Sequence, residues 1–118
     1  MSAAARILVV DDDPVVAGYV CAVLEKAGYA VSSAADLECA TDVAAAEPPD
    51  LLLSDVVLGR VDGLDVAEAV RSIRPEVKTL FMSGYARPRY RTGAEDPVLV
   101  KPFEADELLE RVGGLLDR

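Results

Sequence analysis

Four short hydrophobic runs in this 118-residue chain each end at a side chain that can handle a phosphoryl group. The runs and the groups that follow them are residues 7–10 with Asp11 and Asp12, 51–54 with Asp55, 80–82 with Ser83, and 98–100 with Lys101. In open α/β sheets the carboxyl ends of parallel strands meet at one edge, where ligands bind. The pattern therefore predicts a single site that combines acidic groups, a hydroxyl and a lysine.

The acidic residues of this set predict a site for a divalent cation. Asp11, Asp12 and Asp55 would lie close together at the sheet edge, and crowded carboxylates favour protonation unless a cation neutralises them. Mg2+ prefers oxygen ligands, keeps several waters and usually shares its site with phosphate. The alternative is a solvated turn that caps a helix, which accounts for Asp13 but not for the two acids before it.

The remaining polar groups indicate phosphoryl transfer. Carboxylates can accept phosphoryl groups covalently, so Asp55 is the candidate nucleophile. Lys101 offers a compact cation and Ser83 a hydroxyl for the phosphoryl oxygens. The transition state is loose, so such groups act through their position and charge. Simpler alternatives stay open, namely a surface lysine at Lys101 and an ordinary turn at Ser83.

The elements that would position these groups alternate between strand and helix. Strands are expected at residues 6–11, 29–34, 50–55, 77–82 and 98–100, and helices at 14–27, 36–47, 64–73 and 104–116. The first helix has Asp13 as its predicted N-cap and Pro14 at its first position, and Gly28 ends it. Residues 56–62 are expected to form a loop. The alternation predicts an α/β fold whose parallel sheet is doubly wound, with helices on both faces.

One stretch, residues 84–97, departs from this regularity. It contains two glycines and two prolines, so at most one or two helical turns fit there. Arg87, Arg89 and Arg91 form a basic cluster within it. A solvated loop and a dedicated recognition patch both remain possible for this cluster.

Composition excludes several classes of function. The net charge of −9 argues against nucleic-acid binding, no apolar run reaches the length of a membrane span, and the first residues do not form a signal peptide, so a cytoplasmic protein is expected. The lack of histidine excludes a Ser-His or Cys-His catalytic pair within the chain. Cys21 and Cys39 are expected to be reduced and packed as small hydrophobes, with a disulfide or redox pair as the alternative.

Taken together, the motifs resemble the receiver domain of two-component response regulators. The resemblance extends from Arg6 to Leu116, and the family's motifs occur in the family's order. They are residues 9–14 (Val-Val-Asp-Asp-Asp-Pro), Asp55 followed by 62–64 (Asp-Gly-Leu), 82–85 (Met-Ser-Gly-Tyr) and 101–103 (Lys-Pro-Phe).

The resemblance implies a flavodoxin-like fold with five parallel strands in the order 2-1-3-4-5, and a single receiver domain over residues 1–118. It implies that Asp55 accepts a phosphoryl group from the phosphohistidine of a histidine kinase or a histidine phosphotransfer protein. Mg2+ would be bound by Asp11, Asp12, Asp55 and the backbone carbonyl of Val57. Ser83 and Lys101 would bind the phosphoryl oxygens, and Pro102 would follow a cis peptide bond.

Three features depart from the family pattern. Val98 stands where the family usually has a tyrosine or phenylalanine that swings inward on activation. Tyr85 is an aromatic that could partly replace it or could screen the phosphoryl group from water. Gly59 stands where proline is common, so a more mobile loop is expected. The short distance in sequence between Ser83 and Lys101 predicts a shortened or irregular fourth helix.

The leading hypothesis is therefore a signalling domain that assists its own phosphorylation and dephosphorylation, and is not otherwise an enzyme. Its output would run through protein contacts, with the Val16, Tyr19 and Val20 face of the first helix as the candidate surface. One alternative is an interaction module that works without phosphorylation on the same fold. A second is a Mg2+-dependent phosphatase with an aspartyl nucleophile, although such enzymes usually carry Asp-x-Asp after the first strand and a cap domain.

Overall fold

A computed structural model describes residues 4–59, 61–84 and 97–117 of the chain. The strands of its main sheet are β1 (Arg6–Val10), β2 (Ala30–Ala34), β3 (Leu51–Asp55), β6 (Lys78–Ser83) and β7 (Val98–Val100). The helices in the described residues are α1 (Pro14–Lys26), α2 (Leu37–Ala46), α3 (Gly63–Ile73) and α4 (Ala105–Leu116). Two further strands, β4 (Val57–Leu58) and β5 (Val61–Asp62), form a separate pair.

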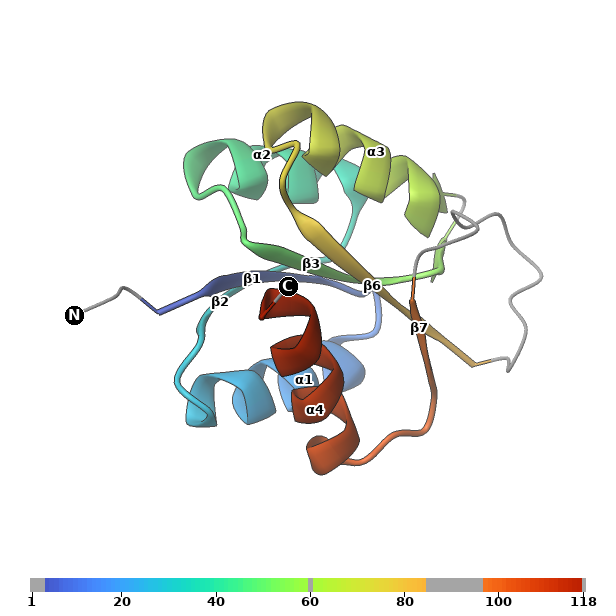
Figure 1. Cartoon of the computed structure of the whole chain (residues 1–118). Helices are drawn as coiled ribbons and strands as arrows, with labels where there is room; N and C mark the ends of the chain where they lie inside the picture. Colours follow the sequence, from blue (N-terminus) through green and yellow to red (C-terminus); the bar gives the residue numbers. More distant parts are fainter. Residues whose placement is uncertain (1–3, 60, 85–96, 118) are drawn as a thin grey trace.

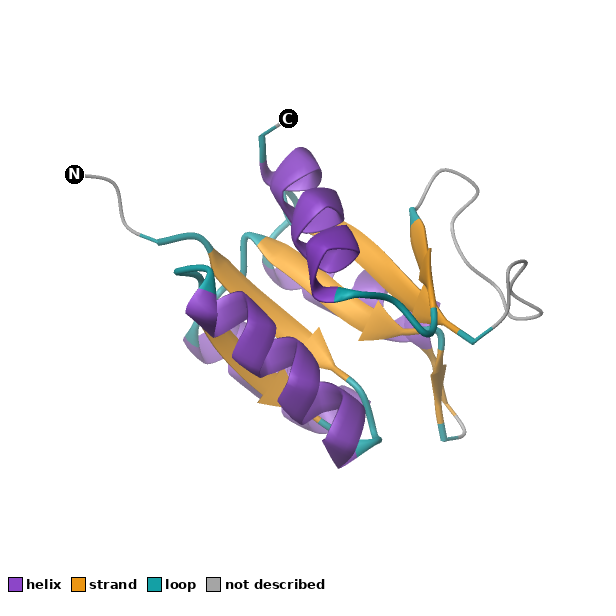
Figure 2. Ribbon diagram, turned by 90° about the horizontal axis from the view of Figure 1, so that it is seen from below, coloured by secondary structure: helices purple, strands orange, loops and turns teal. Residues whose placement is uncertain are grey.

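The main sheet has five parallel strands in the order β2-β1-β3-β6-β7. Counted within this sheet alone, the order is the 2-1-3-4-5 that the sequence predicts. Helices α2 and α3 pack together on one face, and α1 and α4 cover the other (Figure 1). The doubly wound α/β fold is thereby confirmed. Figure 2 shows the sheet between the two helical layers from a second direction.

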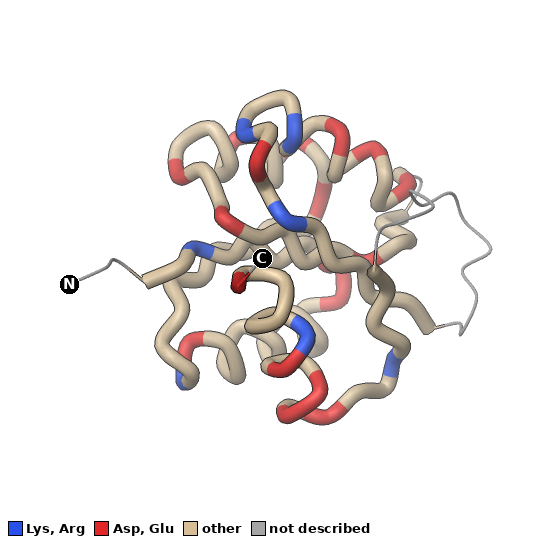
Figure 3. The backbone as a smooth tube through the Cα atoms, viewed as in Figure 1, with Lys and Arg blue, Asp and Glu red and all other residues tan. Residues whose placement is uncertain are grey.

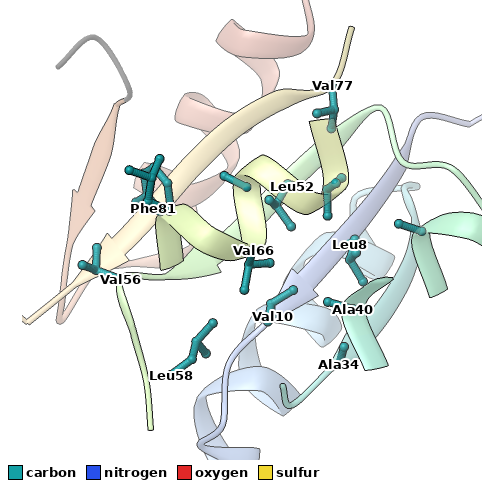
Figure 4. Close-up of a cluster of buried hydrophobic side chains, with 14 residues drawn as sticks. Leu8, Val10, Ala34, Ala40, Leu52, Val56, Leu58, Val66, Val77 and Phe81 are labelled. Carbon is teal, nitrogen blue, oxygen red and sulfur yellow. The ribbon is translucent and has the colours of Figure 1, made fainter. Parts of the chain in front are cut away.

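The apolar strands are continuous because both faces of the sheet are buried. Leu8, Val10, Leu52 and Phe81 point toward α2 and α3 and form one core with residues of those helices (Figure 4). The residues between them on the strands point the other way and pack against α1 and α4; they are Ile7, Val9, Leu51, Leu53, Leu80 and Met82. This double burial fixes the pairing register of each strand, since a slip by one residue would exchange the two cores.

Side-chain caps start three of the helices, each within one residue of its predicted start. Asp13 accepts a hydrogen bond from the N–H of Val15, with Pro14 as the first helical residue. Asp36 and Asp62 cap α2 and α3 in the same manner. After α1 the chain turns at Gly28, whose φ of 102° is a conformation that residues with a side chain rarely adopt. Aspartate side chains therefore mark where α1, α2 and α3 begin, and Gly28 marks where α1 ends.

The segment predicted as a loop after Asp55 contains regular structure. Val57 pairs with Asp62 and Leu58 with Val61, which makes a short antiparallel hairpin. Gly59, with a φ of 61°, lies in its turn. Strands of two residues leave no periodic pattern in a sequence, which is why the prediction of a loop was wrong.

Other predictions concern residues 85–96, which lie outside the described residues. They include the shortened or irregular fourth helix, the role of Tyr85 and the cluster of Arg87, Arg89 and Arg91. Acidic residues are spread over both helical layers of the described chain (Figure 3). None of the helices in residues 4–59, 61–84 and 97–117 combines the length and apolar character of a membrane span.

Candidate functional site

The register of the parallel strands brings the predicted polar groups to one edge of the sheet. Val10 pairs with Ser54, so Asp11 and Asp55 both follow at the same level of neighbouring strands. On the other side Asp55 pairs with Met82, which places Ser83 one residue beyond. Ser83 pairs with Val100, and Lys101 follows directly. Four segments that are distant in the chain thus end at a single site, as the sequence predicts.

Three carboxylates gather at this edge. Asp11, Asp12 and Asp55 each offer an oxygen, and these atoms lie within 4.8 Å of one another. Asp11 is buried, Asp55 is half-buried and Asp12 is exposed. A compact set of carboxylate oxygens that is open on one side matches the way Mg2+ binds proteins, through one or two carboxylates and several waters. The donor set present in the structure therefore fits the cation that the family implies.

Lys101 is the cation that the described structure places against this cluster. Its Nζ lies 3.0 Å from Oδ2 of Asp55 and 3.3 Å from Oδ2 of Asp11, donating a hydrogen bond to each. Burial by itself lowers the pKa of Lys101, but the hydrogen bonds and negative charges of Asp55 and Asp11 outweigh it and raise the pKa above its ordinary value. Lys101 is therefore held in its charged form beside Asp55.

Asp11 is the buried member of the cluster. Burial raises the pKa of its carboxyl group, and the hydrogen bond from the N–H of Asp13 (2.9 Å) and the charge of Lys101 offset this only in part. The negative charge of Asp55 raises the pKa further. One lysine thus leaves the cluster short of positive charge, which favours an additional cation at the same place.

Asp55 is held by the backbone that follows it. The N–H of Val57 lies 3.4 Å from its Oδ1, and the N–H of Val56 bonds to the carbonyl of Met82 (2.9 Å). Gly63, the first residue of α3, lies against the backbone carbonyl oxygen of Asp55, and its N–H donates to the carbonyl of Val56 (2.7 Å). A β-carbon on Gly63 would overlap that Asp55 oxygen, so the contact requires glycine.

Gly63 is the site residue that sequence reasoning missed. The sequence predicts a loop up to Asp62 and a helix from residue 64, whereas α3 begins at Gly63 with Asp62 as its cap. A glycine directly after a helix cap was a signal that two pieces of backbone approach closely, but only the fold identifies the partner.

Ser83 and the Lys101–Pro102 bond also lie where the sequence predicts. Ser83 is buried at the end of β6, and its carbonyl accepts the N–H of Lys101 (2.7 Å). The Lys101–Pro102 peptide is cis. Ser83 and Lys101 therefore lie at the ends of the neighbouring strands β6 and β7, with the Lys101 ammonium beside Asp55.

Two predicted residues are located but their predicted roles stay predictions. Val57 is the first residue of β4, and the role of its carbonyl as a ligand rests on the family resemblance. Val98 is half-buried in β7, and its carbonyl accepts a hydrogen bond from Nη2 of Arg111 in α4 (3.3 Å). The β-branched side chain of Val98 cannot swing as an aromatic ring does.

The predicted contact face of α1 needs correction. Val20 is fully buried and belongs to the core side of the helix, whereas Val16 is half-buried. The exposed residues are Val15, at 78% exposure, and Tyr19, at 47%. Together with Val16, Lys101, Pro102 and Phe103 they border an apolar cleft beside the acidic site. The error arose because helical spacing alone does not show which apolar positions the sheet covers.

Comparisons with known proteins agree with this geometry. Residues 7–113 match the sequence model of the response regulator receiver domain. The chain is 35% identical over 120 residues to the DNA-binding dual master transcriptional regulator RpaA of Synechocystis, covering 96% of this chain and 49% of RpaA. It is 32% identical over 115 residues to the response regulator receiver protein CpdR of Brucella abortus, covering 94% of this chain and 96% of CpdR.

Solved structures show the same fold. A response regulator from Chloroflexus aurantiacus superimposes with a TM-score of 0.84 at 34% identity, over 98% of this chain and 99% of that one. The chain therefore spans about half of RpaA but nearly the whole of CpdR and of this solved chain.

Proposed function

Because the chain belongs to the family of response regulator receiver domains, we propose that it is a phospho-accepting switch in which Asp55 takes a phosphoryl group from a partner's phosphohistidine. The observation that carries this proposal is the arrangement around Asp55. Its half-buried carboxylate lies beside those of Asp11 and Asp12 and 3.0 Å from the Lys101 ammonium. These are the groups that phosphoryl transfer to a carboxylate requires.

In the transfer, an Asp55 carboxylate oxygen attacks phosphorus while the bond between phosphorus and the donor imidazole nitrogen breaks. The electron pair of that bond stays with the imidazole. Lys101 and Ser83 bind the phosphoryl oxygens and hold the group in line for attack. Asp11, Asp12, Asp55 and the Val57 carbonyl would hold Mg2+, which would supply positive charge against the negative charge that develops on the phosphoryl oxygens.

The ion pairs of Lys101 define the state of the site before phosphorylation. Before transfer, Lys101 is shared between Asp55 and Asp11. After transfer the negative charge of Asp55 resides on the phosphoryl oxygens, and Lys101 follows it. The residues after Lys101 then shift, and they border the cleft with Val15 and Tyr19. Val98 takes no part by ring rotation, and Tyr85 is proposed to act in its place.

Partners follow from the proposed chemistry. The chain contains no histidine, so the donor is a histidine kinase or a phosphotransfer protein, and output runs through protein contacts. Residues 1–118 form a single receiver domain in this proposal, and a cytoplasmic location remains a prediction. The net charge of −9 disfavours nucleic-acid contact by residues 1–118.

The proposal is tested by intact mass after incubation with acetyl phosphate, with and without Mg2+. Wild type should gain one phosphoryl group only when Mg2+ is present, and Asp55→Asn should gain none. Asp42→Asn, an exposed site on α2, is the matched control and should behave as wild type. Wild type that gains no phosphoryl group in excess donor, sampled within seconds, would contradict the proposal and favour a module that works without phosphorylation. Sustained release of phosphate from small phosphomonoesters would favour a phosphatase instead.

A further inference from the structure

A second concave surface adjoins the acidic site. It lies beside strand β2, between α1 and α2, which flank the sheet on opposite faces (Figure 1). The cleft has a volume of about 420 Å3, and its walls include Asp11, Asp12, Cys21 and Cys39. Both cysteines of the chain thus share a solvent-open space with two of the proposed Mg2+ ligands.

The two thiols differ in accessibility. Cys39, in the first turn of α2, is exposed, which corrects the expectation that both cysteines pack as small hydrophobes. Cys21 is half-buried on α1 and hydrogen-bonded to Ser33, and burial together with the charge of Glu25 raises the pKa of its thiol. Because the thiolate is the reacting form, Cys39 is the thiol open to reagents and Cys21 is the less reactive one.

We propose that this cleft is a thiol-modification site at which Cys39 forms a mixed disulfide with a low-molecular-weight disulfide. The Cys39 thiolate attacks one sulfur of the reagent, and a new S–S bond forms as the reagent's S–S bond breaks. The departing thiolate takes up the proton that Cys39 released. The added substituent then occupies the cleft that Asp11 and Asp12 border.

The consequence for the acidic site rests on the proposed function. Mg2+ keeps several waters when it binds carboxylates, and those waters need the space beside Asp12. A substituent in the cleft competes for that space, and the expected loss is roughly tenfold in Mg2+ affinity, as for other outer-shell changes at metal sites. By reciprocity, saturating Mg2+ disfavours the mixed disulfide by the same factor at equilibrium.

The test uses bis(2-hydroxyethyl) disulfide, whose adduct is uncharged, so that the effect on Mg2+ is not one of added charge. Wild type, Cys39→Ser and Cys21→Ser are incubated with it, and adducts are located by intact mass and peptide mapping. Wild type and Cys21→Ser should each gain one adduct on Cys39, whereas Cys39→Ser should remain unmodified over the same time. Circular dichroism checks that each variant is folded.

Mg2+ binding by calorimetry on modified and unmodified protein completes the test. Weaker binding after modification supports the inference, and unchanged binding overturns the coupling. Faster labelling of Cys21, or replacement of the adduct by an internal disulfide, overturns the assignment to Cys39. If unmodified protein fails to bind Mg2+ at all, the proposed function fails, while the adduct mapping still decides the modification site.

Discussion

The backbone carbonyl oxygen of Asp55 lies against the α-carbon of Gly63, at a distance that leaves no room for a side chain. This contact joins the end of the strand that carries the proposed phosphoacceptor to the start of α3. A β-carbon at this position would also lie 3.0 Å from the Cα of Val56, so backbone on both sides would have to move.

Gly63→Ala is therefore expected to destabilise the domain by about 1–3 kcal/mol, the usual cost of overpacking, and to slow phosphorylation of Asp55. Urea denaturation and the rate of acetyl phosphate labelling measure the two effects. Gly18→Ala is the control, because nothing lies within 4 Å of its β-carbon and it sits on exposed α1. That variant should gain up to about 1 kcal/mol from helix propensity. Equal stability to urea and equal labelling rates for Gly63→Ala and Gly18→Ala would show that the Gly63 contact is unimportant.

Asp11→Asn should stabilise the Mg2+-free domain at neutral pH. The pKa of Asp11 is raised in the folded chain, so the folded state binds its proton more readily than the unfolded state does. The contribution of Asp11 to stability is then most favourable at acid pH, and it declines as pH rises from the ordinary carboxyl range through the raised pKa. Asparagine has the same shape, keeps an oxygen to accept the N–H of Asp13 and carries no charge.

Urea midpoints across acid to neutral pH, in chelator, measure this effect. As pH rises over that window, wild type should lose stability relative to Asp11→Asn. If the urea midpoints of the two proteins change with pH in parallel, the raised pKa of Asp11 is contradicted. Mg2+ should reverse the ranking. At a concentration one hundred times its Kd, a ligand that binds only the folded state adds about 2.7 kcal/mol, which the variant should largely lose.

Lys101→Met tests the positive charge at the site. Removing the ammonium leaves Asp11 and Asp55 without the cation that donates to both. The Mg2+-free variant should be less stable by about 1–3 kcal/mol, because a buried charge loses its partner. Mg2+ should bind more tightly, since Lys101 no longer competes for the carboxylates, yet Asp55 should be phosphorylated more slowly. Lys26→Met, exposed at the end of α1, should leave stability, Mg2+ affinity and labelling unchanged.

Much of the site could be predicted because its parts are local signals. Each apolar run is a strand that both sheet faces bury, and the polar group after it marks the carboxyl end. Asp13 followed by Pro14 marks a helix start for the same local reason. The strand order was predicted from the family resemblance. Given that order, the hydrophobic pattern of the strands determines the register that aligns Asp11 with Asp55.

The rest depends on how separate elements pack. The contact of Gly63 with Asp55 and the cleft shared by Cys21 and Cys39 join residues whose spacing carries no signal. The exposure of Cys39 and the burial of Val20 depend on which side of each helix the sheet covers. Helical periodicity restricts which side of a helix can face the sheet, but it does not determine which residues are buried.

A substitution at Asp50, which lies at the end of the sheet opposite the acidic site, should lower stability without changing the proposed function. Its Oδ2 accepts the N–H of Arg6 (2.8 Å) and its Oδ1 accepts Nη2 of Arg74 (3.0 Å), which joins the start of β1 to the end of α3. Asp50→Ala should therefore cost about 1–3 kcal/mol in urea denaturation, because the half-buried donors lose their charged acceptor. Mg2+ affinity and labelling of Asp55 should stay as in wild type under conditions where the variant is folded.

Glu47→Gln, which alters only the exposed pair with Arg6, should change stability by less than about 1 kcal/mol. A loss of Mg2+ affinity in Asp50→Ala would show that the two ends of the sheet are coupled.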